Sequence, residues 1–162
     1  MMLIRAATVD DAARCAEIYA PFVTGSWVSF ETDAPSLAEM AQRIRDYGGS
    51  HAWLVAEAHN EVIGYAYASP HRTRAAYSTS VDVAVYVEAG HARRGVGSLL
   101  YSALFPILKH KGMHAAFAGI ALPNDASIAL HKACGFTSVG VYREVGWKAD
   151  KWRDVGWWQR LL

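Results

Sequence analysis

The spacing of hydrophobic positions changes along the chain, and this change predicts a domain that mixes strands and helices. The clearest strand covers residues 81–87, where four alternate valines form one face and Asp82, Ala84 and Tyr86 form the other. Six further strands are expected at residues 3–6, 53–56, 62–67, 115–121, 137–145 and 155–161. The second and third of these form a predicted hairpin that turns across residues 59–61.

Four helices are expected between the strands, over residues 8–22, 36–48, 95–111 and 125–133. Ser36 and Glu39 form a capping box at the start of the second helix. Gly135 follows the fourth helix and is typical of a helix end. With no internal repeat and no linker-like stretch, residues 1–162 are expected to form a single α/β (α+β) domain around a central sheet.

The composition of the chain argues against several classes of protein. Hydrophobic residues make up 52% and charged residues 19%, which argues against disorder, and the net charge of +1 argues against a general nucleic-acid binder. The sequence has no apolar run long enough for a membrane span, and Asp10 and Asp11 come too early for a secretory signal. Cys15 and Cys134 form no CxxC pair or zinc cluster, so we expect no metal site. Two unpaired cysteines also favour a cytoplasmic location.

The segment 90–100 joins the valine strand to the third helix and carries the first chemical signal. Gly95 and Gly97 let the backbone approach a ligand closely, and Arg93 and Arg94 add positive charge at a helix N-terminus. These features suit a pyrophosphate, although an ordinary glycine-rich turn with exposed arginines fits the same residues. Leu100 replaces the third glycine of the dinucleotide fingerprint, and the Gly-Lys-Ser/Thr of a Walker loop is missing.

A second signal lies in residues 124–136, where the pattern Asn-x-x-Ser-x-x-Leu-His-x-x-x-Gly-Phe occurs. Together with Gly95 and Gly97, it resembles the acetyl-CoA motifs of the GCN5-related N-acetyltransferase (GNAT) superfamily. Ala92 departs from that pattern, because Gln or Arg usually occupies its place. A helix with a C-cap glycine and a half-buried histidine is the alternative interpretation of residues 124–136.

The resemblance becomes narrower over residues 77–87, 122–125 and 152–159, which are similar to the phosphinothricin (or methionine sulfoximine) N-acetyltransferase family. The likeness runs over about residues 4–159. It implies the GNAT fold, with a single mixed, mostly antiparallel sheet of about seven strands and about four helices. It also implies acetyl-CoA as co-substrate, acetyl transfer to the α-amine of a small glutamate-like compound, and a homodimer.

The same resemblance implies two catalytic residues. Asp82 stands where the family has a Glu base, and because its side chain is one methylene shorter, we expect it to act through water. A strand carboxylate paired with a neighbouring arginine is the structural alternative. His131 occupies a position near the CoA sulfur in the superfamily, and we expect it to give a proton to the leaving thiolate.

Binding residues are carried over from the family in the same way. The expected cofactor-binding residues are Val85, Tyr86, Val87, Arg93, Arg94, Gly95, Val96, Gly97, Ser98, Asn124 and Ser127. Backbone N–H groups near Tyr86 and Val87 are expected to bind the thioester oxygen. The expected substrate-binding residues are Phe30, Arg72, Arg74 and Tyr77, although the two arginines also fit solvated loop charges.

Three hypotheses of function remain open from the sequence. The first is an acetyl-CoA-dependent N-acetyltransferase for a small amino acid analogue. The second is an acetyltransferase for protein N-termini or lysines, which needs an open groove. The third is a non-catalytic CoA-binding regulatory domain, which the changes at Asp82 and Ala92 keep open.

Overall fold

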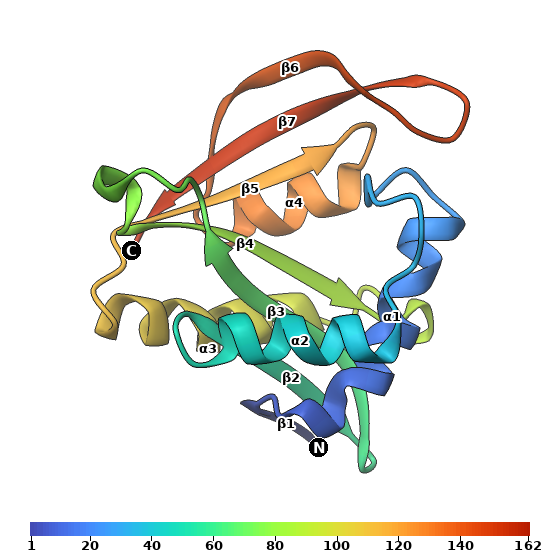
Figure 1. Ribbon diagram of the computed structural model, residues 1–162, viewed down its shortest axis with the longest axis vertical. Helices are drawn as coiled ribbons and strands as arrows, with labels where there is room; N and C mark the ends of the chain where they lie inside the picture. The colour runs from blue at the N-terminus through green and yellow to red at the C-terminus, as the bar shows by residue number, and fades with distance from the viewer.

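A seven-stranded mixed sheet forms the centre of the computed structural model, which describes residues 1–162 (Figure 1). The strand order is β1-β2-β3-β4-β5-β7-β6, and every neighbouring pair is antiparallel except β4 and β5. The strands are β1 (Met2–Ala6), β2 (Ala52–Ala58), β3 (Glu61–Pro70), β4 (Ser80–Val87), β5 (Ala115–Ala121), β6 (Thr137–Trp147) and β7 (Trp152–Leu161). The predicted mostly antiparallel sheet is therefore confirmed.

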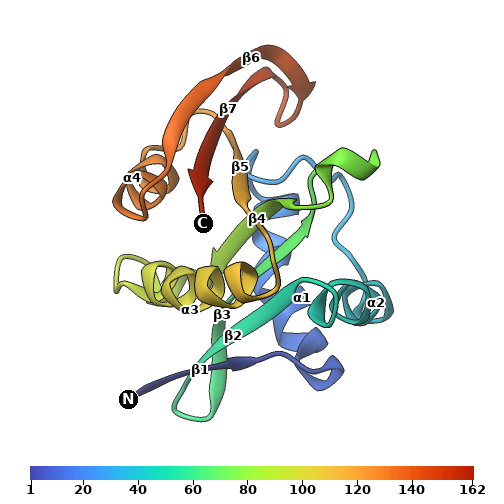
Figure 2. The same ribbon diagram turned by 90° about the vertical axis from the view of Figure 1, so that its left-hand side faces the viewer.

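Four α-helices cover the two faces of this sheet. They are α1 (Ala12–Thr24), α2 (Leu37–Gly48), α3 (Val96–His110) and α4 (Asp125–Ala133). Figure 2 shows α1 and α2 on one face, with α3 and α4 on the other. None of them is both long enough and apolar enough to cross a membrane.

The alternation along β4 divides the core as its pattern predicts. Val81 and Val83 are buried with α3 on one face of the sheet. On the opposite face Tyr86 packs against a second cluster, formed by α1, α2 and the middle strands. Asp82 shares that second face, so the carboxylate comes out of the sheet on the side of α1 and α2.

Strands β4 and β5 separate soon after they begin. They pair only over Ser80–Asp82 and residues 115–117, and beyond these residues β5 continues against β7. The Glu88 N–H donates to the Ile63 carbonyl of β3, so in the alternating antiparallel ladder the N–H of Tyr86 also points at β3. The N–H groups of Val85 and Val87 point the other way, into the gap between β4 and β5.

Three local details differ from the sequence-based expectation. The β2–β3 hairpin turns on two residues, His59 and Asn60, which both have positive φ as a type I′ turn requires. A short 3₁₀ turn capped by Thr8 precedes α1. Strands β6 and β7 both extend further toward the turn that joins them than the predicted 137–145 and 155–161.

Candidate active site

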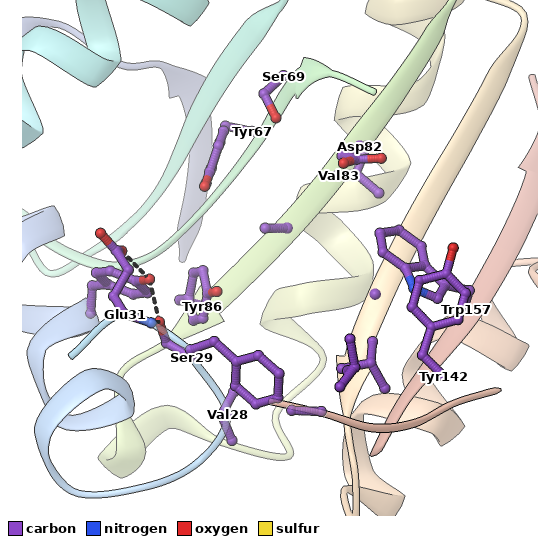
Figure 3. Close-up of a pocket in the computed structure, with 17 residues that line it drawn as sticks. Val28, Ser29, Glu31, Tyr67, Ser69, Asp82, Val83, Tyr86, Tyr142 and Trp157 are labelled. Carbon is purple, nitrogen blue, oxygen red and sulfur yellow. Dashed lines mark hydrogen bonds between the residues drawn. The ribbon is translucent and has the colours of Figure 1, made fainter. Parts of the chain in front are cut away.

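A cavity of about 620 Å³ opens on the Asp82 side of β4, and we call it the large cavity. Its volume lies in the usual range for small-molecule sites. Most of its wall is apolar or aromatic, with contributions from Tyr67, Tyr86, Tyr142 and Trp157. The predicted substrate residue Phe30 also lines it. Figure 3 shows Asp82 and Trp157 on the side opposite Glu31. The carboxylates of Asp82 and Glu31 are the only charged side chains in the wall.

Asp82 is fixed by a residue that sequence reasoning missed. His71 Nδ1 lies 2.6 Å from Asp82 Oδ1, so the carboxylate is paired with a histidine and not with an arginine. Burial raises the pKa of Asp82 above its usual value, while the His71 hydrogen bond and the charge of Arg72 act in the opposite direction. His71 follows β3 directly, and one further step of the β3–β4 ladder places it opposite Ser80, on the same face as Asp82 and diagonal to it.

The other carboxylate, Glu31, lies in the loop between α1 and α2. Arg43 of α2 binds it through two nitrogens, at 2.9 and 2.5 Å, and the Tyr19 hydroxyl also donates to it. The pKa of Glu31 is lowered, chiefly by the Arg43 hydrogen bond. Lys148 donates to the backbone carbonyls of Ser29 and Glu31, both at 2.6 Å. The loop that forms one wall of the large cavity is thus tied to α1, α2 and the β6–β7 turn.

A cleft of about 460 Å³ lies beside the N-terminus of α3, and we call it the loop cleft. The predicted cofactor-binding residues that line it are Val85, Tyr86, Val87, Arg93, Gly95, Val96, Gly97, Ser98, Asn124 and Ser127. Arg94 is exposed and does not line it. A Cβ on Gly97 would come within 3.0 Å of the Leu130 side chain, so glycine allows α3 to approach α4 here.

A small space of about 60 Å³, which we call the passage, lies along the gap between β4 and β5 and shares lining residues with both the large cavity and the loop cleft. Tyr86 lines all three, and Asn124 and Ser127 line both the passage and the loop cleft. The N–H groups facing this gap belong to Val85 and Val87, whereas the Tyr86 N–H points at β3. Binding of the thioester oxygen by N–H groups near Tyr86 and Val87 stays a prediction.

His131 also lines the passage, at 4% exposure. Its Nδ1 donates to the Ser127 carbonyl at 2.7 Å, and its Nε2 lies 3.0 Å from the Tyr101 hydroxyl. Burial lowers the pKa of His131, so the neutral ring predominates at pH 7. Because protein groups occupy both nitrogens, a role as proton donor stays a prediction.

The remaining predicted substrate residues lie outside the large cavity. Arg72, Arg74 and Tyr77 fall in the exposed segment between β3 and β4, and none of them lines the wall. Tyr77 only meets the edge of the His71 ring. Their part in substrate binding stays a prediction. The structure gathers no three His, Cys, Asp or Glu side chains that would hold a metal ion.

Comparison with known proteins agrees with this arrangement of motifs. A family model described as an acetyltransferase (GNAT) domain matches residues 4–157. The chain belongs to the GNAT acetyltransferase family. Its N-acetyltransferase fold places the glycine motif of α3 and the Asn124 motif of α4 around one cleft, as in the resemblance noted from the sequence.

Relatives within the GNAT family carry more specific names. A phosphinothricin N-acetyltransferase of Streptomyces viridochromogenes is 40% identical over 97% of this chain and 86% of its own length. An L-methionine sulfoximine/L-methionine sulfone acetyltransferase of Salmonella typhimurium is 32% identical over 99% of this chain and 95% of its own. A GNAT superfamily phosphinothricin acetyltransferase from Sinorhizobium meliloti, solved in complex with acetyl-CoA, superposes with a TM-score of 0.95 at 34% identity, covering 99% of this chain and 88% of that one.

Proposed function

We propose that the protein transfers the acetyl group of acetyl-CoA to the α-amine of a small amino acid analogue of the phosphinothricin or methionine sulfoximine type. The observation that carries this proposal is the neighbouring pair of spaces, each of which shares lining residues with the passage. A glycine-rich helix N-terminus lies in the loop cleft, a carboxylate lies in the large cavity, and the passage between them follows an unpaired strand edge. The relatives' names support the substrate class.

The residues of the loop cleft fit acetyl-CoA. The first N–H groups of α3 and the side chain of Arg93 suit its pyrophosphate. The Asn124 Oδ1 accepts the Ser127 N–H at 3.1 Å, which leaves the Asn124 amide nitrogen free to donate to the pantetheine arm. Val85 offers a free N–H and C=O along the same path. When bound, acetyl-CoA supplies the thioester to be attacked.

The chemical step needs a neutral amine, an oriented attack and a stabilised oxyanion. Asp82 takes the proton of the substrate ammonium, in our proposal through one water molecule. In our proposal, one of the N–H groups of Val85 and Val87 donates to the thioester oxygen as its charge grows. One such preorganised donor is typically worth about 3 kcal/mol. Alignment of the two reactants in these neighbouring spaces supplies a further part of the acceleration.

The test is release of free thiol from acetyl-CoA with a panel of amines. The panel holds L-phosphinothricin, L-methionine sulfoximine, L-methionine sulfone, L-glutamate and a mixed-sequence peptide. We expect turnover with the small analogues, and Asp82→Asn to lower kcat by about 10²- to 10⁴-fold while acetyl-CoA binding is retained. Turnover of the peptide alone would replace the proposal with a protein-modifying activity. Binding of acetyl-CoA without any turnover would favour a non-catalytic domain.

We further propose that two copies pair along β6. This edge strand is exposed over nearly all its length and presents Val139, Val141, Val145 and Trp147 to solvent. Unprotected apolar edges tend to associate. Tyr142 and Val145 also line the large cavity, so a second copy on β6 would help to enclose it. Sedimentation should give a dimer, and Val141→Lys should shift it toward monomer; a monomeric parent protein would refute this pairing.

A further inference from the structure

Asp82 has one hydrogen-bonding partner, which contacts only one of its two carboxylate oxygens. His71 Nδ1 contacts Oδ1 at 2.6 Å, whereas Oδ2 makes no hydrogen bond within the chain. The same carboxylate lines the large cavity. Since ionised Asp82 can only accept, the proton between the two atoms lies on Nδ1, and the neutral ring then carries its lone pair on Nε2.

The His71 ring is held in place by aromatic neighbours. It stacks on Phe117 of β5 with centroids 4.4 Å apart and an interplanar angle of 19°. Its edges meet Tyr77 and Trp157, each at 6.1 Å. The side chain of His71 is only 14% exposed. This packing fixes the direction of Nδ1, so the orientation of the Asp82 carboxylate is set from outside the large cavity.

Few charges act on this pair. The titratable or charged groups that face it from the surrounding elements are Tyr67 on β3, Arg72 and Tyr77 in the following segment, and Tyr142 on β6. Phe117 and Trp157 carry no charge. Burial therefore raises the pKa of Asp82, and the His71 N–H with the charge of Arg72 is what opposes that rise.

We propose that His71 is a positioning residue for the acetyl transfer proposed above, on which this inference rests: its Nδ1–H holds Asp82 Oδ1, keeps the carboxylate ionised and presents Oδ2 to the amine. In the step itself an N–H bond of the ammonium breaks and an O–H bond forms at Oδ2, directly or across one water. His71 keeps its Nδ1 proton throughout. The proton on Oδ2 later passes to solvent through the open large cavity.

Two substitutions separate the hydrogen bond from the packing. His71→Phe keeps a ring on Phe117 and removes the donor, whereas His71→Asn removes the ring and keeps an amide donor near the place of Nδ1. We expect His71→Phe to lower kcat/KM for the amine about tenfold or more. The acidic side of its kcat/KM–pH profile, which we call the acid limb, should move upward by about one pH unit. His71→Asn should keep the acid limb of the parent protein. The acetyl-CoA Kd should stay unchanged in both.

Two readouts do not depend on turnover. Nitrogen-15 NMR of the parent protein at pH 8 should show His71 protonated at Nδ1, with the resonance identified by its loss in His71→Asn; protonation at Nε2 would overturn the inference. Carbon-13 NMR of the Asp82 carboxyl should show a higher pKa in His71→Phe than in the parent protein, and equal values would likewise overturn it. Thermal denaturation verifies that both variants are folded.

Failure of this inference is distinguishable from failure of the proposed function. If Asp82→Asn is inactive and His71→Phe keeps the parent acid limb, Asp82 is the base and His71 only packs against it. If Asp82→Asn is fully active, Asp82 is not the base, and the proposed mechanism fails together with the role of His71.

Discussion

The carboxylate of Glu31 ties the loop over the large cavity to two helices, so neutralising it should loosen that wall. In Glu31→Gln the side chain keeps nearly the same size but loses one acceptor oxygen and its charge. Both bonds from Arg43 and the bond from Tyr19 are affected. Glu31, Arg43 and Tyr19 do not line the loop cleft and make no hydrogen bond with Asp82, so the effect should fall on the amine.

The size of the effect follows from the contacts. A hydrogen bond to a charged group contributes about 1.5–3 kcal/mol, and Gln keeps only one of the two oxygens that Arg43 contacts, so the loss is about 2 kcal/mol. Glu31 is 35% exposed, and solvent screening reduces this to about 1 kcal/mol. If the loss appears as loop opening, the KM for the amine rises about fivefold at unchanged KM for acetyl-CoA.

The pH dependence gives an independent check. Because the pKa of Glu31 is lowered in the folded protein, its contribution is present above the usual carboxylate pKa of about 4.3 and is lost as pH falls through the folded value. In urea denaturation, the free energy of unfolding of Glu31→Gln should therefore be lower than that of the parent protein at pH 7, and this difference should shrink as the pH falls below the usual carboxylate pKa. Glu17→Gln, at an exposed pair on α1, is the control. An unchanged amine KM with unchanged stability at pH 7 would refute the reasoning.

Three further predictions concern other parts of the fold. Gly97→Val overpacks the approach to Leu130, costs about 1–3 kcal/mol and weakens acetyl-CoA binding in calorimetry; unchanged affinity would contradict this. Arg5→Met leaves the buried Asp11 with one of three hydrogen bonds and costs about 1–2 kcal/mol at pH 7. Since the pKa of Asp11 is lowered, chiefly by Arg5, the cost should shrink as urea unfolding is repeated toward pH 3; an equal cost at both pH values would contradict it. Burial raises the pKa of Cys15 to about 12, so a disulfide reagent at pH 8 should label it only after unfolding, and rapid labelling of the native protein would disprove its burial.

The sequence predicted the features that depend on neighbouring residues. The capping box at Ser36 and the two faces of β4 are present in the structure because each follows from local spacing. The end of β6 and the start of β7 were predicted less accurately, because both strands continue further toward the turn between them. Strand β6 is exposed and its register shifts twice against β7, after Ser138 and after Tyr142, so no burial pattern marks its length.

In the candidate site, too, the features that depend on neighbouring residues could be predicted, and those that depend on distant contacts could not. Gly95 and Asn124 could be assigned to the loop cleft because a helix N-terminus carries its binding groups within a few consecutive residues. The pairing of Asp82 with His71 depends on the β3–β4 register, which the sequence did not supply. The charges of Arg72 and Arg74 suggested contacts with an anion, yet their segment stays at the surface.

The early separation of β4 from β5 has a mechanical consequence. The sheet consists of two parts, β1–β4 and β5–β7, which are paired with each other at three residue pairs (Figure 1). If the two parts spread to admit or release a long ligand, the movement pivots about these three pairs. Asp82 is the last paired residue of β4 and therefore lies at the hinge, where displacement is smallest. Such spreading along the unpaired edge would therefore leave the carboxylate of Asp82 nearly still.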